Sequence, residues 1–267
     1  MPTNVIIIGA LGRMGREIGR IVHGDNAVRI AGAVERADHP ERGEDYGSLM
    51  GFGEIGVRVE STIGSGTAGG AVAVSFTTAE TLDSVLDQVR ASPLPIVVGT
   101  TALSAAQHSR VADLARRVPV VCSPNMSLGV NLLFALTEIA ARRLKDEFDI
   151  EIVEAHHRHK KDSPSGTARK LGEIAASALG REYDSAVRHG RHGSGAERTS
   201  GEIGMHAVRG GEIVGDHTVL FAGAAERLEL RHSAQSRSTF ARGAVAAAKW
   251  VAEKEPGLYS MKDVLEL

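Results

Sequence analysis

The N-terminal stretch NVIIIGALGRMGREIGRIV constrains the fold of this chain more than any other. Its continuously apolar, β-branched run, Val5 to Ile8, is typical of a strand that is buried on both faces of a parallel sheet. Gly9, Gly12 and Gly15 follow, and apolar residues then recur at helical spacing. Glycines let a backbone turn tightly and approach a pyrophosphate, whose charge the first amides of a helix can meet. The order strand, glycine turn, helix therefore predicts a dinucleotide-binding loop.

A second apolar run, VRIAGAV, leads into Glu35, which lies about twenty residues beyond the glycine turn, as this fingerprint expects. A carboxylate there can accept hydrogen bonds from the adenosine ribose, whereas Arg36 could pair with a 2'-phosphate. The spacing is G-x-x-G-x-x-G, not the commoner G-x-G-x-x-G. The alternative is therefore a glycine turn in another α/β fold, followed by a surface acid–base pair.

Strand and helix patterns continue to alternate as far as Asn125. This alternation predicts the α/β class, with a Rossmann-like, doubly wound parallel sheet. Because parallel strands place their ligands at their carboxyl ends, the loops after three successive strands should line one cleft. These loops are Phe76–Thr78, Gly99–Thr101 and Ser123–Met126.

A long helical pattern after Asn125 marks the start of a second domain. We expect a dinucleotide-binding domain over 1–127, joined by a C-terminal return over 237–267, and a substrate-binding and oligomerisation domain over 128–236. The second domain should be α+β with a largely antiparallel sheet, in which Gly210-Gly211 forms a hairpin turn. Residues 184–201 are rich in Gly, Ser, Arg and His without a period, which predicts a mobile surface loop.

Composition excludes several classes of protein. The net charge of -2 argues against a general nucleic-acid binder, and no apolar stretch approaches the length of a transmembrane helix. Hydrophobic residues make up 42% and charged residues 24%, as in an ordinary soluble protein. Cys122 is the single cysteine and cannot form an internal disulfide, so we expect a reducing, cytoplasmic location.

The stretch EAHHRHKKDSPSGTA, from Glu154 to Ala168, concentrates the chemistry of the second domain. Metal ligation by His156, His157 and His159 is one interpretation, since imidazole suits zinc and iron. However, adjacent histidines on a strand point to opposite faces, and the neighbouring lysines repel a cation. A basic loop for nucleic acid is another interpretation, but the chain offers no aromatic platform or basic stripe beside it.

A third interpretation uses every part of this stretch. Pro164 restricts the residue before it, and Ser165-Gly166-Thr167 opens a helix whose amides and hydroxyls can bind a carboxylate. His157 and Lys160 add cationic donors. Either His156 or Lys160 can supply a proton, because imidazole titrates near neutral pH and burial lowers the pKa of a lysine. An anion site, an acid and a dinucleotide together imply hydride transfer.

The chain resembles the dihydrodipicolinate reductases, also called 4-hydroxy-tetrahydrodipicolinate reductases. The resemblance rests on GALGRMGREI, AVER, VVGTT, SPNMSLGVNLL, EAHHRHKKDSPSGTA and VGDHTVLFAGAAERLELRHSAQSRSTFARGAV, and it spans nearly the whole chain. It implies NADH- or NADPH-dependent reduction of a cyclic, unsaturated dicarboxylate in the diaminopimelate route to lysine. It also implies a homotetramer that assembles through the second-domain sheet. No metal, nucleic acid or membrane is implied.

The resemblance also assigns roles to residues. It makes His156 the catalytic acid/base and Lys160 the proton donor. It places substrate contacts at His157, Lys160, Ser165, Gly166 and Thr167. On the cofactor side it matches the pyrophosphate loop Gly9, Ala10, Leu11, Gly12, Arg13 and Met14, the adenosine contacts Glu35 and Arg36, and the nicotinamide-side residues Gly99, Thr100, Thr101, Ser123, Pro124, Asn125 and Met126.

The chain departs from the family pattern at two places. Many members carry Arg-Pro where this chain has Thr78-Ala79, which removes a cationic partner for the adenosine end of the cofactor. Leu11 stands where a small residue is frequent. With Arg36 as the remaining phosphate partner, we expect NADH to work at least as well as NADPH. The rival classes are a non-catalytic NAD(P)-binding regulator and a similarly built dehydrogenase for an amino or keto acid.

Overall fold

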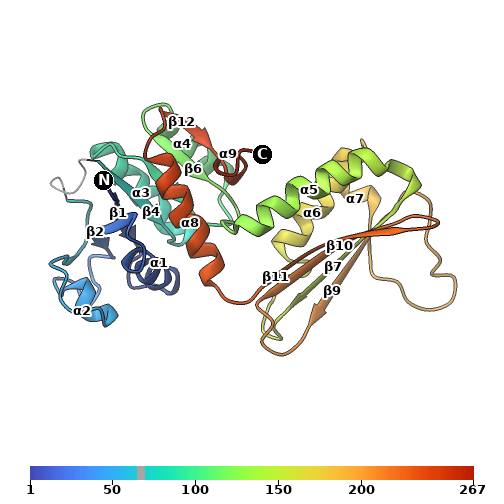
Figure 1. Ribbon diagram of the computed structural model, residues 1–267, viewed down its shortest axis with the longest axis horizontal. Helices are drawn as coiled ribbons and strands as arrows, with labels where there is room; N and C mark the ends of the chain where they lie inside the picture. The colour runs from blue at the N-terminus through green and yellow to red at the C-terminus, as the bar shows by residue number, and fades with distance from the viewer. Residues whose placement is uncertain (65–69) are drawn as a thin grey trace. The chain divides into compact units, whose positions relative to one another are not determined.

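The computed structural model describes residues 1–64 and 70–267, which divide into two units. Unit 1 comprises Met1–Leu128 and Arg237–Leu267, and unit 2 comprises Gly129–Ser236 (Figure 1). The chain therefore leaves unit 1 once and returns to it. Among the residues described, no helix is both long enough and apolar enough to span a bilayer.

Unit 1 is built on a seven-stranded sheet in which every pairing is parallel. In spatial order its strands are β12 (Gly257–Tyr259), β6 (Pro119–Cys122), β5 (Ile96–Val98), β4 (Ala71–Ser75), β1 (Thr3–Ile8), β2 (Val28–Val34) and β3 (Val59–Glu60). The apolar N-terminal run is β1, between β4 and β2. The prediction of a Rossmann-like parallel sheet is confirmed.

Helices cover both faces of this sheet, which explains why β1 is apolar at successive positions. The helices of unit 1 are α1 (Arg13–His23), α2 (Tyr46–Met50), α3 (Ala79–Ala91), α4 (Ala105–Ala115), α8 (Ser238–Val251) and α9 (Met261–Val264) (Figure 1). Val5 and Ile7 belong to the same core cluster as buried residues of α1 and α8. Ile6 and Ile8 belong to the opposite cluster, with α3 and α4. Side chains alternate along a strand, so both sides of β1 are buried.

Unit 2 carries the five-stranded sheet of β11 (Arg227–Ala234), β10 (Gly215–Ala222), β7 (Asp149–His156), β9 (Ile203–Arg209) and β8 (Val187–His189), in that spatial order. Its helices are α5 (Leu128–Leu144), α6 (Gly166–Ala178) and α7 (Tyr183–Ala186), with a 3-10 turn, η1, at Lys145–Glu147. Ile152 and Phe221 of the sheet pack in one core cluster with Leu133 of α5 and Leu171 of α6. One face of the sheet is thus covered by helices.

The expected second sheet is present, and it is mixed. Its β11–β10 and β10–β7 pairings are antiparallel, whereas β7–β9 and β9–β8 are parallel. The predicted hairpin at Gly210-Gly211 is wrong, because β7 lies between β9 and β10. An alternating strand pattern on both sides of a glycine pair is the same for a hairpin and for a connection that passes a third strand.

The segment 184–201, predicted to be a loop, contains the edge strand β8 and is fastened by ion pairs. Arg191 pairs with Glu151 of β7 at 2.7 Å and also with Glu202. Arg198 pairs with Asp149 at 2.8 Å and also with Glu151. Two arginines of this stretch therefore attach it to the first half of β7.

Helix α8 packs closely because one of its residues lacks a side chain. A Cβ at Gly243 would lie 1.6 Å from the carbonyl oxygen of Met126, a backbone atom that cannot move independently.

We predict that Gly243→Ala destabilises the protein by about 1–3 kcal/mol through overpacking, although alanine favours an isolated helix. Thermal unfolding measures the change. Gly210→Ala, whose Cβ would meet nothing within 4 Å, is the control, and equal stability of the two variants would contradict the packing described.

Candidate active site

In unit 1 the glycine turn joins β1 directly to α1. Gly9 has φ +76°, a conformation that favours glycine, and its carbonyl oxygen accepts from the Gly12 amide at 3.1 Å. A Cβ at Gly15 would lie 2.1 Å from the Gly9 oxygen, so the helix can begin this close to the strand only with glycine there. The N-cap, Gly12, has no side chain, and the first turn carries no acidic residue. The helix start is therefore suited to an anion.

Side chains from other elements brace this loop. The buried Tyr46 hydroxyl, from α2, donates to the Gly15 carbonyl at 3.2 Å. Arg16 Nε donates to the Leu11 carbonyl at 2.9 Å, and the Leu11 amide donates to Glu35 Oε2 at 3.1 Å. Glu35, which follows β2, thus contacts the loop itself. The loop conformation is held by hydrogen bonds before any ligand is considered.

Two cavities lie beside the loop and share Phe76 and Thr77 in their walls. The Glu35 cavity has a volume of about 860 Å³. It is lined by Ile8, Gly9, Gly12, Val34, Glu35, Arg36, Ala37, Ser61, Thr62, Phe76, Thr77, Thr78, Thr81, Ser84, Val85 and Gln88. The Asn125 cavity, of about 440 Å³, is lined by Arg13, Met14, Phe76, Thr77, Gly99, Thr101, Pro124, Asn125, Met126 and Phe240.

The Asn125 cavity unites the three loops that follow β4, β5 and β6, as the sequence predicts. Gly99 matters here, because a Cβ at this position would lie 2.4 Å from the Phe76 ring. Thr100 and Ser123 are buried, and Ser123 Oγ donates to the Asn125 carbonyl at 3.1 Å. Of the predicted nicotinamide-side residues, these two lie behind the wall of the cavity.

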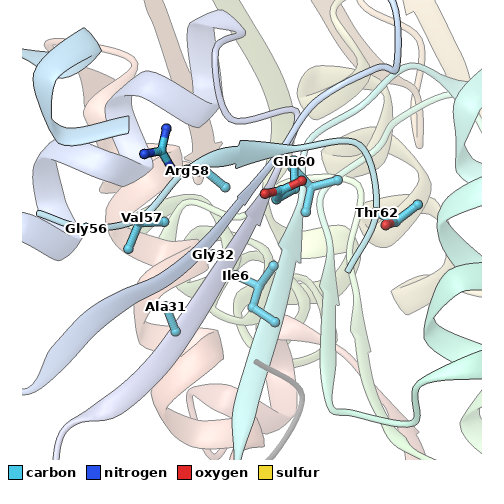
Figure 2. A pocket seen from close by; sticks show the side chains of 10 residues that line it. Ile6, Ala31, Gly32, Gly56, Val57, Arg58, Glu60 and Thr62 are labelled. Atoms are coloured by element: carbon cyan, nitrogen blue, oxygen red, sulfur yellow. The ribbon is translucent and has the colours of Figure 1, made fainter. Parts of the chain in front are cut away.

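A third hollow has a volume of about 320 Å³ (Figure 2). It adjoins the Glu35 cavity through Val34 and Thr62, which line both. Its wall is formed by β1, by β2 and by the segment from Gly56 to Thr62. Figure 2 shows Ile6 among the side chains that line it. Arg58 donates to the Gly43 carbonyl at 2.7 Å, so its guanidinium already has a partner.

In unit 2 the second half of β7 forms a buried polar cluster. Glu154 is fully buried, and two residues later on the same face of the strand lies His156, which is 8% exposed. His156 Nδ1 lies 2.5 Å from Glu154 Oε2. The two terminal guanidinium nitrogens of Arg209 each donate to this carboxylate at 2.8 Å, and the Ser165 amide donates to Oε1 at 3.0 Å. One carboxylate therefore holds a histidine, an arginine and the start of a helix.

These contacts set the ionisation of the cluster. Burial opposes the charged form of Glu154, but hydrogen bonds from Arg209, His156 and the Ser165 amide outweigh it and hold the pKa of this carboxyl below its usual range. Burial lowers the pKa of His156, and the Glu154 carboxylate offsets part of that shift. At neutral pH the pair is therefore an ionised carboxylate beside a neutral imidazole.

Ser165 caps α6 as the sequence predicts. Its hydroxyl oxygen accepts from the Ala168 amide at 3.2 Å and lies 3.0 Å from Nε2 of the buried His217 on β10. The first turn of α6 contains no acidic residue, and a Cβ at Gly166 would meet nothing within 4 Å. The helix start thus faces open space at Gly166, while the Ser165 side chain is turned inward.

The lysine of the motif lies in the loop between β7 and α6. Lys160 Nζ pairs with Asp162 Oδ1 at 2.9 Å, and the Lys160 amide donates to the His157 carbonyl at 3.1 Å. The rings of His157 and His159 lie 6.3 Å apart. Over residues 1–64 and 70–267, no three His, Cys, Asp or Glu side chains are grouped as metal ligands.

Two family profiles match the chain, one for each part. Residues 3–126 match the profile "Dihydrodipicolinate reductase, N-terminus", and residues 129–265 match "Dihydrodipicolinate reductase, C-terminus". The chain belongs to the dihydrodipicolinate reductase family. It is therefore an oxidoreductase, and the resemblance seen in the sequence is confirmed.

Full-length relatives agree with this membership. The 4-hydroxy-tetrahydrodipicolinate reductase of Thiobacillus denitrificans is 48% identical over 267 residues, which cover 100% of both chains. That of Syntrophus aciditrophicus is 46% identical over 260 residues, 97% of each chain. A solved dihydrodipicolinate reductase from Paenisporosarcina sp. TG-14, bound to dipicolinate, shares the fold with a TM-score of 0.75 at 22% identity, covering 97% of this chain and 98% of that one.

The structure of this reductase gathers the predicted residues into two groups, one in each unit. Sequence reasoning missed Arg209 and His217, which lie beside the motif only because β9 and β10 flank β7 in a particular register. His156 is paired with Arg209 across β7–β9, and Glu154 with His217 across β7–β10. Glu154 itself could have been found, since it precedes His156 by two residues on a predicted strand.

The buried His217 generates a pH prediction. Burial, reinforced by the charge of His156, lowers the pKa of His217 from 6.5 to about 4. The unfolded chain therefore binds more protons between these pH values, and stability falls as the pH is lowered from 6.5 to 4, by roughly 3 kcal/mol for this group. We predict that His217→Gln flattens this part of the stability profile, measured by urea unfolding. His108→Gln, at an exposed site on α4, is the control and should leave the slope unchanged.

Proposed function

We propose that this chain catalyses the NADH- or NADPH-dependent reduction of 4-hydroxy-tetrahydrodipicolinate, by way of dihydrodipicolinate, to tetrahydrodipicolinate in the diaminopimelate route to lysine. The observation that carries the proposal is similarity over the full length to 4-hydroxy-tetrahydrodipicolinate reductases. The intact polar cluster on β7 supports it, because a protein that only bound a nucleotide would have no need of a buried acid–base pair.

The cofactor is assigned to unit 1. A dinucleotide needs close backbone approach at its pyrophosphate, and Gly12, the N-cap of α1, has no side chain to obstruct that approach. We assign the pyrophosphate to the loop Gly9–Met14, the adenosine end to the Glu35 cavity and the nicotinamide end to the Asn125 cavity. When bound there, the nicotinamide supplies the hydride.

NADH should serve at least as well as NADPH. Among the described residues that line the Glu35 cavity, Arg36 is the sole cation, and it pairs with Asp38 at 3.3 Å. The face of α3 toward this cavity offers Thr81, Ser84 and Gln88, which are neutral. A 2'-phosphate would therefore find one partly engaged guanidinium, next to the Glu35 carboxylate.

The substrate is assigned to unit 2. The start of α6 at Gly166 and Thr167, together with His157 and Lys160, would hold the carboxylates of a cyclic dicarboxylate. Hydride addition leaves negative charge at the ring nitrogen, and either Lys160 or Nε2 of His156 would deliver the proton. The buried Ser165 hydroxyl shapes the loop by capping α6 and meeting His217, whereas its neighbours reach the substrate.

Two further features of the enzyme are inferred. The helix-free face of the unit 2 sheet exposes Val153 and Val208, which supports assembly of a homotetramer through this sheet. We also infer a cytoplasmic enzyme that binds no metal. Analytical ultracentrifugation of the purified protein tests the tetramer, and a monomer at micromolar concentration would reject it.

The decisive test is cofactor oxidation with substrate generated in place by the preceding synthase, from pyruvate and aspartate semialdehyde. We predict synthase-dependent oxidation of NADH, with a kcat/KM no lower than that for NADPH. Omission of the synthase is the control. Folded protein that oxidises neither cofactor would support a non-catalytic regulator or a dehydrogenase for another acid. A strong preference for NADPH would reject the prediction that NADH serves at least as well.

Lys160 provides a sharper test of the proton donor. We predict that Lys160→Ala lowers kcat about 100-fold or more, as expected for loss of a general acid, and leaves the affinity for NADH unchanged. Steady-state kinetics and NADH fluorescence titration measure the two effects. Lys161→Ala removes the exposed neighbouring lysine and is the matched control. A near-normal kcat in Lys160→Ala would assign the proton to His156 alone.

A further inference from the structure

The geometry points to Glu154 and Arg209 as a positioning pair that fixes the tautomer of His156 and anchors the substrate loop through one carboxylate. Neither residue is assigned to contact substrate or cofactor. The inference rests on the proposed function for its kinetic consequences, but the tautomer can be measured without turnover.

The two carboxylate oxygens of Glu154 bind different partners. Oε2 faces His156 Nδ1 at 2.5 Å, and Oε1 accepts from the Ser165 amide at 3.0 Å. Arg209 spans both oxygens with two parallel hydrogen bonds of 2.8 Å, which fixes the plane of the carboxylate. A displacement of Glu154 would therefore move the histidine and the start of α6 together.

An ionised carboxylate can only accept hydrogen bonds, so Nδ1 of neutral His156 must carry its proton. Nε2 then keeps its lone pair and can take up or release a proton during the reaction. A Cβ at Gly215, the neighbouring residue on β10, would lie 3.0 Å from Nε2, so glycine leaves room beside this atom. Within the described part of the chain, Nε2 has no hydrogen-bond partner.

Arg209 extends the arrangement to the second proton-handling residue. Besides binding Glu154, it donates to the Asp162 carbonyl at 2.7 Å. The Asp162 side chain in turn pairs with Lys160 at 2.9 Å. The Arg209 guanidinium thus connects the Glu154 carboxylate, which holds His156, with the loop that carries Lys160.

The charged and titratable groups around His156 come from each neighbouring element. Glu154 lies on its own strand, Arg209 on β9 and His217 on β10, while Lys160 and Asp162 lie in the loop before α6. Glu154 favours the imidazolium, whereas Lys160 and Arg209 disfavour it. Loss of the Glu154 charge should therefore lower the pKa of His156 further.

The test is Glu154→Gln, which preserves size and can still accept from the Ser165 amide. The new amide nitrogen would face Nδ1 and donate a hydrogen bond to it. Nδ1 would then be the acceptor, so the proton of the neutral imidazole should lie on Nε2 instead. We predict this tautomer in nitrogen spectra of 15N-histidine-labelled protein at pH 8, against Nδ1–H in the unaltered enzyme. We also predict a fall in kcat of about 100-fold or more with KM changed far less, since an amide at the corresponding place in a serine protease triad lowers kcat about 10⁴-fold.

Glu151→Gln is the matched control. Glu151 lies on the same strand and is also bound by arginine and by a histidine, His206, at 2.7 Å. This variant should leave the tautomer of His156 unchanged and kcat within about twofold. Wild-type tautomer and kcat in folded Glu154→Gln would overturn the inference. An altered tautomer in an enzyme that never reduces the proposed substrate would uphold the positioning role and reject the proposed function.

Arg209 gives a second, independent test that does not require Glu154→Gln to fold. Arg209→Gln should lower kcat at least tenfold, because the carboxylate loses its cation and its fixed plane. Arg209→Lys restores the charge without the planar fork, so its kcat should lie between that of Arg209→Gln and the unaltered enzyme. Values of kcat for both variants within about twofold of the unaltered enzyme would reject the role of Arg209.

Discussion

The polar cluster of unit 2 depends on one buried carboxylate. Glu154 has no exposure to solvent, and an ion in that position is tolerated only with several donors around it. The donors come from three places in the chain, His156 on β7, Ser165 at the start of α6 and Arg209 at the end of β9. The stability of this part of the fold and the orientation of the His156 ring therefore have the same origin.

Unit 1 depends on a different constraint, the close approach of the α1 backbone to the loop that follows β1. Gly15 lets α1 begin against the Gly9 carbonyl, and Tyr46 and Arg16 hold the loop from outside it. In both units a helix whose first turn carries no acidic residue begins directly after a strand or the loop that follows it. In unit 1 that helix start has no side chain at its cap, whereas in unit 2 the cap, Ser165, is itself anchored to the acid–base cluster.

Much of this could be read from the sequence, because it depends on local patterns. The apolar run of β1, the glycine spacing and the Pro-Ser-Gly-Thr helix start are each encoded by a few adjacent residues. Arg209 and His217 could not be found in this way, since only the registers of β7 with β9 and β10 bring them to the motif. For the same reason the sequence pattern predicts a hairpin at Gly210-Gly211 where none exists, because strand order is not a local property.

The most direct test of the account is the ionisation of Glu154 in the folded enzyme. Glutamate labelled with 13C at the carboxyl carbon would be titrated by NMR, with the Glu154 signal identified by its loss in Glu154→Gln. The account predicts that this carboxyl remains ionised from pH 8 down to below its usual pKa of about 4.3, where protonation and loss of structure coincide. A carboxyl that takes up its proton above that value, while the fold is intact, would contradict the anchoring role on which the site is built.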